Sequence, residues 1–176
     1  ALAQCLSDYV LLLNPDCFVE PETIEKMIAV MEEHPDAGMA SCLVVNPDGS
    51  EQGGCRRLVP TPWRTFVRVL HLHRIVKNHP RFSSFVMTDR PLPMAAEPVE
   101  AISGAFMFLR REAFERVGLM DEDYFLHCED LDWCMRFRQA GWKILFEPQA
   151  RAVHLKGLSS KSRPLFCEYH KHRGMV

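Results

Sequence analysis

The stretch Tyr9-Val-Leu-Leu-Leu-Asn-Pro-Asp16 decides which fold class this sequence adopts. Its apolar part is continuous, which is the pattern of a strand covered on both faces, as in a parallel sheet. Asn14-Pro15-Asp16 then ends the strand, because Asn, Pro and Asp all form turns. Ligands bind at the carboxyl ends of strands in open α/β sheets. An Asp at this point can bind Mg²⁺ or Mn²⁺ through one oxygen and leave the other positions for phosphate oxygens and water.

An ordinary turn is the alternative for this tripeptide. The same three residues recur as Asn46-Pro47-Asp48, followed by Gly49, and there the sequence predicts a plain turn. The tripeptide alone therefore does not establish a binding site, and its neighbours along the chain have to be considered.

A helix and a second buried strand are predicted after the first strand. Pro21 suits the first turn of a helix, and His34-Pro35-Asp36 ends it. Between them, apolar residues recur at helical spacing: Ile24, Met27, Ile28 and Met31. Residues 39–45 form the next apolar run. Strand, helix and strand in this order predict an α/β fold with a mixed, mainly parallel sheet flanked by helices.

The composition is that of a globular protein of one domain. The 176 residues are 47% apolar and 25% charged, with a formal net charge of −2. This excludes a disordered chain, and no apolar run is long enough to span a membrane. Seven cysteines without a CxxC pair predict reduced thiols and a cytoplasmic location. Because the chain starts at Ala1 without an initiator Met, we expect it to begin inside a larger protein.

Basic residues concentrate between residues 56 and 90, where eight Arg and Lys accompany one acid, Asp89. A helix is predicted within 60–77, and its apolar residues share one face: Trp63, Phe66, Val67 and Leu70. We expect this face to pack on the sheet; the alternative is contact with an anionic membrane surface. We expect no nucleic-acid partner, because no nucleic-acid-binding motif accompanies the basic residues.

Two further groups of polar residues have the chemistry of a site. Glu129, Asp130 and Asp132 begin a predicted helix, where acids either cap free N–H groups or accept a proton from a bound hydroxyl. Residues 143–146 and 150–154 are the last predicted strands. His154 ends the second of them, where it is either a structural residue or a ligand. Gly157 and Ser159 follow it and would allow a phosphate to approach the backbone.

Taken in order, these segments resemble the inverting family 2 glycosyltransferases of the GT-A fold, especially rhamnosyltransferase-like members. The matching stretches span most of the chain: residues 9–16, 103–118, 121–125, 129–132 and 154–159. We therefore expect an α/β, GT-A-like fold that lacks the N-terminal nucleotide-binding units of the family.

The resemblance implies a role for each candidate residue. Asn14 and Asp16 stand in the place of the DxD motif, with Asn14 departing from the usual Asp, and Asp16 and His154 would hold Mn²⁺ or Mg²⁺. Gly157 and Ser159 would cover the phosphates of the donor. Asp130 would be the catalytic base of the ED motif. The remaining residues would support the base or help bind the acceptor: Gly104, Glu129 and Asp132.

The implied activity is metal-dependent transfer of a sugar from a nucleotide diphosphate sugar to a glycan or lipid-linked acceptor. Rhamnose is the sugar that the resemblance suggests, and the enzyme would act at the inner face of the membrane. The alternative is a non-catalytic remnant that binds glycans or a protein. We expect one partial domain with four parts: 1–55 with the metal motif, 56–98 on the acceptor side, 99–160 with the catalytic half, and 161–176 as a tail.

Overall fold

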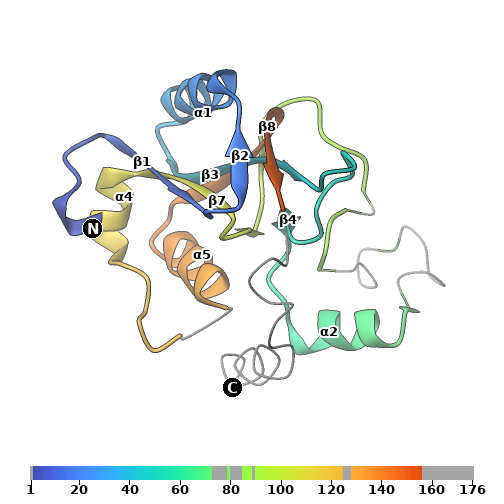
Figure 1. The fold of residues 1–176 in the computed structure, drawn as a ribbon. Coiled ribbons are helices and arrows are strands. Elements are labelled where there is room, and N and C mark those ends of the chain that lie inside the picture. Colours follow the sequence, from blue (N-terminus) through green and yellow to red (C-terminus); the bar gives the residue numbers. More distant parts are fainter. Residues whose placement is uncertain (1, 73–78, 80–84, 89, 125–127, 156–176) are drawn as a thin grey trace.

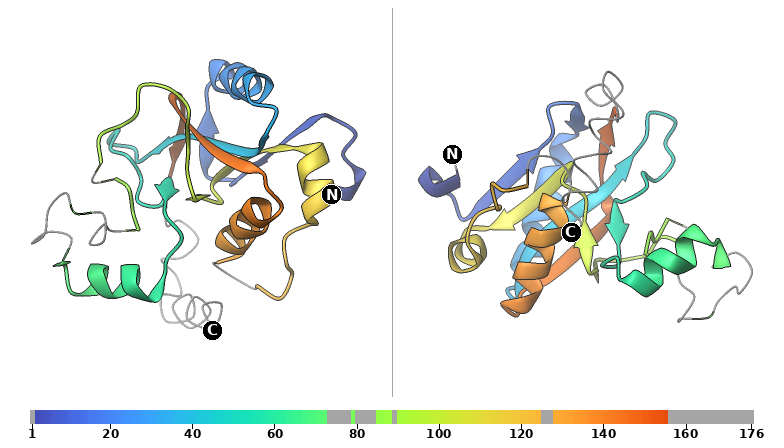
Figure 2. Two further views of the ribbon diagram at one scale, coloured as in Figure 1. Left: turned by 180° about the vertical axis from the view of Figure 1, so that it is seen from behind. Right: turned by 90° about the horizontal axis from the view of Figure 1, so that it is seen from below.

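A central sheet lies between two layers of helices in the computed structural model, which describes residues 2–72, 79, 85–88, 90–124 and 128–155. Helix α1 covers one face of the sheet, and α4 and α5 cover the other (Figure 1). Helix α2 stands to one side of the sheet in all views (Figures 1 and 2). The described helices are η1 (Leu2–Gln4), α1 (Pro21–Glu33), α2 (Pro62–Val69), α4 (Arg111–Val117) and α5 (Glu129–Gln139).

The sheet is mixed, with the order β1-β7-β3-β8-β2 and with β5 paired to β8. Strands β3 and β8 are parallel, whereas the other pairings of this sheet in the described residues are antiparallel. It follows that β1, β3 and β8 run in one direction and that β7, β2 and β5 run in the other. Its strands are β1 (Tyr9–Leu13), β2 (Cys17–Val19), β3 (Ala37–Val45), β5 (Glu97–Pro98), β7 (Phe106–Arg110) and β8 (Lys143–His154).

A smaller sheet joins β4 (Arg56–Arg57) to β6 (Ala101–Ile102). Among the described residues, no helix has the length and apolar composition that crossing a membrane requires.

The α/β fold class and the mixed sheet are confirmed, and so are the first strand, the helix after it and the second buried strand. Three features differ from the expectation. The sheet was expected to be mainly parallel, but in the described residues only β3 and β8 pair in parallel, because β7, β2 and β5 run against their neighbours. Strand β2 was not predicted, because three residues are too few to show a pattern. The expected strands at 143–146 and 150–154 form one strand, β8, with an irregularity in its register where Glu147 and Arg151 face consecutive residues of β3.

The core lies on both faces of β3 and β8. Helix α5 places Trp133 and Phe137 in this core edge to face, with ring centroids 5.4 Å apart. Phe106 of β7 and Phe146 of β8 are fully buried as well. Burial of large apolar side chains of this kind stabilises a fold by about 1.5–3 kcal/mol each. Strand β8, which ends at His154, is therefore part of this core.

The expectation that α2 packs its apolar face on the sheet is wrong for most of that face. Trp63 is 43% exposed, Phe66 48% and Leu70 49%. The buried side of α2 is occupied by Val67 and by Arg64, whose guanidinium is paired with Glu100. Because that buried side lies at one edge of the apolar face, about half of the surface of Trp63, Phe66 and Leu70 is open to solvent.

Substitution of Gly38 allows a test of the packing between β3 and helices α4 and α5. A Cβ at this position would lie 2.8 Å from Ala113 Cβ and 2.9 Å from Phe137 Cδ1. We expect Gly38→Ala to lower the free energy of unfolding by about 1–3 kcal/mol, because a well-packed core resists an added methyl group. Urea denaturation measures this. Gly53→Ala is the matched control, since nothing lies within 4 Å of its Cβ. Equal stability of the two variants would contradict this packing.

Candidate functional site

Several candidate residues meet at one edge of the sheet. Because β1, β3 and β8 run in the same direction, their carboxyl ends lie together, and these ends lead to Asn14, Asn46 and His154. The antiparallel strands β2 and β7 begin at the same edge. Asn14 and His154 thus lie at the carboxyl ends of strands, as the sequence predicts. This is the edge at which open α/β sheets bind ligands, and that a ligand binds here stays a prediction.

Asp16 and His154 are brought into contact by the pairing of β2 with β8. Cys17 lies opposite His154 in the register, and the backbone N–H of Leu155 donates to the carbonyl of Asp16 at 2.9 Å. Asp16 Oδ1 is consequently 3.1 Å from His154 Nε2, and Asn14 Nδ2 is 3.4 Å from the same nitrogen. Thus Asn14, Asp16 and His154 lie together although 138 residues separate Asp16 from His154.

The surroundings of this pair are partly closed to water. His154 is 8% exposed, and the neighbouring Cys17 is buried. Burial and the negative charge of Asp16 raise the pKa of the Cys17 thiol to about 11. Cys17 is therefore a neutral thiol at physiological pH, and the ionisable groups that face the edge here are Asp16 and His154.

The geometry of Asp16 and His154 fits two neighbouring ligands of one divalent cation. An octahedral cation with bonds of about 2.1 Å holds adjacent ligands about 3 Å apart, which matches the distance of 3.1 Å between Asp16 Oδ1 and His154 Nε2. Within the described residues, no group of three or more His, Cys, Asp and Glu side chains could hold a metal ion. The described residues would thus supply two ligands here, Asp16 Oδ1 and His154 Nε2.

Asp130 is held at the start of α5 by three hydrogen bonds. Its Oδ2 accepts from the N–H of Gly104 at 3.1 Å and from Arg57 Nη2, and its Oδ1 accepts from the N–H of Leu131 at 2.8 Å. Arg57 Nη2 also donates to the carbonyl of Ile102 at 2.8 Å. Asp130 is thus fixed against the turn at residues 103–105.

The same turn links Asp130 to the Asn14 side of the site. The N–H of Asn14 donates to the carbonyl of Ala105 at 3.0 Å, one residue after the Gly104 N–H that binds Asp130. The candidate base and the candidate cation ligands therefore flank one short turn at the edge of the sheet.

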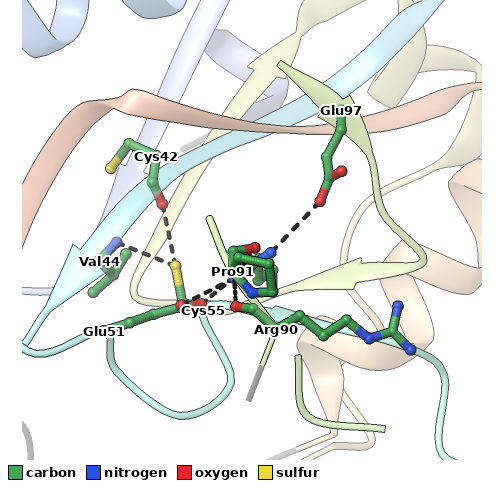
Figure 3. A network of polar contacts seen from close by, with 8 residues as sticks. Cys42, Val44, Glu51, Cys55, Arg90, Pro91 and Glu97 are labelled. Carbon is green, nitrogen blue, oxygen red and sulfur yellow. Dashed lines mark hydrogen bonds and ion pairs between the residues drawn. The ribbon is translucent and has the colours of Figure 1, made fainter. Parts of the chain in front are cut away.

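Arg57 is positioned by its neighbour Arg56, which is 1% exposed. Arg56 Nε donates to Glu51 at 2.9 Å, and its Nη2 donates to the carbonyls of Arg90 at 2.7 Å and Pro91 at 3.2 Å. Figure 3 shows Glu51, Glu97 and the backbone carbonyls of Arg90 and Pro91 around this point, whereas the Arg90 side chain extends away from it. Consecutive strand residues point to opposite faces, so burial of Arg56 directs Arg57 towards Asp130.

The basic segment is less exposed than its composition indicates. Arg56 and Arg57 are paired with Glu51 and Asp130, and Arg64 is paired with Glu100 at 2.7 Å. Burial alone would raise the pKa of Glu100, but the hydrogen bonds from Arg64 and from the Val59 N–H hold that pKa below its ordinary value. These three guanidinium groups therefore bind internal carboxylates.

The other candidate residues lie at different distances from this centre. Glu129 is half-buried beside Asp130, whereas Asp132 accepts a hydrogen bond from Arg136 Nε at 2.8 Å, one helical turn away. Their predicted roles, and that of Gly104 towards an acceptor, stay predictions. Gly157 and Ser159 lie outside the described residues.

The sequence did not identify Arg57 or Gln52 as residues of the site. Gln52 is 4% exposed, and its Oε1 lies 2.7 Å from His154 Nδ1. Arg57 belongs to a run of basic residues, and Gln52 to a loop, so neither stands out by pattern. The only signal that the sequence offers is the positive charge of Arg57, which suits a carboxylate partner such as Asp130.

Comparison with known proteins assigns nearly the whole chain to one family. The family model described as "Glycosyltransferase like family 2" matches residues 1–173. The chain is 30% identical over 159 residues to an N-acetylglucosaminyl-diphospho-decaprenol L-rhamnosyltransferase of Mycobacterium tuberculosis, covering 90% of this chain and 50% of the relative. It is 27% identical over 157 residues to the rhamnosyltransferase WbbL of Escherichia coli K12, covering 84% and 52%.

The chain thus spans about half the length of the curated relatives it matches. Among solved structures, it is similar to GalNAc-T7 crystallised with UDP, GalNAc and Mn²⁺, with a TM-score of 0.57 and 18% identity. That alignment covers 96% of this chain and 31% of the other. At this identity the likeness concerns the fold.

Proposed function

This chain belongs to the family 2-like glycosyltransferases, and we propose that it carries the cation-binding and catalytic part of an inverting glycosyltransferase. The reaction would move a sugar from a nucleotide diphosphate sugar to a glycan or lipid-linked acceptor by a single displacement. Residues 1–55 would supply the cation site, 56–98 the acceptor side and 99–160 the base. The contact between Asp16 and His154 is the observation that carries the proposal.

Asp16 Oδ1 and His154 Nε2 would hold the cation, and Mn²⁺ or Mg²⁺ would neutralise the charge that develops on the leaving diphosphate. A nitrogen ligand favours Mn²⁺ over Mg²⁺. Asn14, whose amide lies next to His154, would donate to a phosphate oxygen. The structure of GalNAc-T7 with UDP and Mn²⁺ is consistent with such a donor site in a related fold.

Asp130 would take the proton from the attacking hydroxyl of the acceptor. Its carboxylate oxygens accept hydrogen bonds from Gly104, Leu131 and Arg57, and these bonds hold it in one orientation. A carboxylate offers about four lone-pair sites, so one site on Oδ1 remains for the hydroxyl. General-base catalysis requires the base to be held within hydrogen-bonding distance of the proton it takes, and it contributes about 10²–10⁴-fold to a rate.

Rhamnose is the sugar and a polyprenyl diphosphate sugar the acceptor that the relatives support best. The Mycobacterium tuberculosis relative is named as a rhamnosyltransferase acting on N-acetylglucosaminyl-diphospho-decaprenol, and the Escherichia coli relative as a rhamnosyltransferase. These are statements about those proteins, and they supply the substrates with which this chain is to be tested first.

We propose further that α2 rests on an anionic membrane surface when the acceptor is lipid-linked. Trp63, Phe66 and Val69 are exposed on this helix, as is Leu70 directly after it, and the rings of Trp63 and Phe66 stack with centroids 5.7 Å apart. Between Glu51 and Asp89 the sequence has no acidic residue. Exposed aromatic residues in a segment without negative charge favour binding to anionic lipid.

The catalytic proposal is tested by transfer assays on the complete gene product with dTDP-rhamnose, Mn²⁺ and a diphosphate-linked acceptor. We expect Asp16→Ala and Asp130→Asn each to lower turnover by about 10²–10⁴-fold, because one removes a cation ligand and the other the base. Asp8→Asn is the control, since Asp8 is 87% exposed. Undiminished turnover in either variant would contradict its assigned role, and transfer by no form of the protein would favour a non-catalytic binding module.

The membrane proposal is tested by sedimentation with vesicles of phosphatidylglycerol and phosphatidylcholine. The variant with both Trp63→Ser and Phe66→Ser should bind at least about tenfold more weakly, because each lost side chain removes apolar area from the lipid. Leu119→Ser, at a residue 47% exposed elsewhere on the surface, is the control. Equal binding to vesicles of phosphatidylcholine alone, or equal binding by the variant, would contradict the proposal.

A further inference from the structure

A chain of hydrogen bonds runs from Asp48, in the second Asn-Pro-Asp turn, to His154. Ser50 Oγ donates to Asp48 Oδ1 at 2.5 Å, and Asn46 Nδ2 donates to Ser50 Oγ at 3.0 Å. Gln52 Nε2 then donates to Asn46 Oδ1 at 3.0 Å, and Gln52 Oε1 lies 2.7 Å from His154 Nδ1. These hydrogen bonds thus connect an exposed turn to the buried imidazole that faces Asp16.

The direction of these hydrogen bonds is set at the Asp48 end. An ionised carboxylate only accepts hydrogen bonds, and the hydrogen bonds from the Ser50 hydroxyl and N–H hold the pKa of Asp48 below its ordinary value. Ser50 Oγ therefore gives its proton to Asp48 and accepts from Asn46. The side-chain amides of Asn46 and Gln52 must then each donate towards Asp48 and accept from the side of His154.

The direction is set a second time at Gln52. Its Nε2 also donates to the backbone carbonyl of His154 at 3.3 Å, and a carbonyl can only accept. The amide nitrogen of Gln52 is thereby fixed on that side, so its Oε1 must be the atom that faces His154 Nδ1. An acceptor at 2.7 Å from Nδ1 requires the proton to be on Nδ1.

We propose that Asn46 and Gln52 are positioning residues that keep the proton of His154 on Nδ1 and so present the lone pair of Nε2 to a divalent cation beside Asp16. With Nδ1 protonated, neutral His154 Nε2 and Asp16 Oδ1 are two acceptors 3.1 Å apart. Two such atoms repel one another unless a proton or a cation lies between them. Groups that orient a metal-binding histidine through its other nitrogen affect metal affinity by about 10–100-fold.

The fold explains why these two residues occupy this place. Val45 of β3 lies opposite Val153 of β8, so the turn that follows β3 starts beside His154. The Asn46 N–H donates to the Ser50 carbonyl and the Gln52 N–H to the Val44 carbonyl, both at 2.9 Å, which brings the chain back along β3. The second Asn-Pro-Asp sequence is therefore a turn, as expected. Through Gln52, its residue Asn46 also supports His154, the proposed cation ligand.

This inference rests on the proposed cation site, but its first test needs no metal. Long-range ¹H–¹⁵N correlation spectra of the metal-free chain at mildly alkaline pH report which nitrogen of His154 carries the proton, and His154→Gln identifies the signal. We expect the Nδ1–H form in the wild type. In Gln52→Met the acceptor at Nδ1 is lost, so the Nε2–H form, which can donate to Asp16, should become populated. A wild-type His154 in the Nε2–H form would overturn the proposal.

The second test is Mn²⁺ affinity, measured from the electron paramagnetic resonance signal of the free ion. We expect Gln52→Met to bind Mn²⁺ about 10–100-fold more weakly than the wild type. Asn46→Ala should have a smaller effect, because Gln52 keeps its hydrogen bond to the His154 carbonyl. Gln149→Met is the matched control, since Gln149 is exposed and donates to the Met94 carbonyl. Circular dichroism identifies any variant that fails to fold. If Gln52→Met fails to fold, the Mn²⁺ affinity of Asn46→Ala tests the inference in its place.

The outcomes separate this inference from the proposed function. Equal Mn²⁺ affinity in Gln52→Met and the wild type would overturn the role of Gln52 and leave the cation site intact. No Mn²⁺ binding by the wild type would contradict the cation site, and the spectrum of His154 would still show whether Gln52 sets its protonated nitrogen.

Discussion

The pairing of β8 with β3 on one side and β2 on the other is the constraint on which the site depends. Its parallel register with β3 places Val153 beside Val45, and its antiparallel register with β2 places His154 opposite Cys17. A shift by one residue would turn His154 to the other face of the sheet. Met39 of β3 and Ile144 and Phe146 of β8 are among the fully buried side chains of the core, so the packing that stabilises the fold also fixes the position of the imidazole.

Three segments that are distant in sequence depend on this register. The turn after β1 supplies Asp16, the turn after β3 supplies Asn46 and leads back to Gln52, and β8 supplies His154. On the other side of the site, the buried Arg56 holds β4 in place, and Arg57 reaches Asp130 from there. His154 and Asp130 are thus oriented by Gln52 and Arg57, which would take no part in the reaction.

Sequence reasoning recovered the elements whose apolar pattern is long, and it placed Asp16 at a strand end because turn residues directly follow the apolar run. It could not find β2, whose three residues have no period, nor the outward face of α2, since an amphipathic pattern does not say which side is buried. Gln52 and Arg57 were also missed. Their part in the site follows from partners far along the chain, His154 and Asp130, and only the folded register shows those contacts.

The proposed function depends on a divalent cation that binds between Asp16 and His154 at the carboxyl-end edge of the sheet. The most direct test is anomalous diffraction at the manganese edge from crystals of this chain grown with Mn²⁺ and UDP. We predict a single strong peak within bonding distance of Asp16 Oδ1 and His154 Nε2. The Nδ1 of the same imidazole should remain hydrogen-bonded to Gln52 Oε1. A peak elsewhere, with Asp16 and His154 remaining in direct contact, would contradict it.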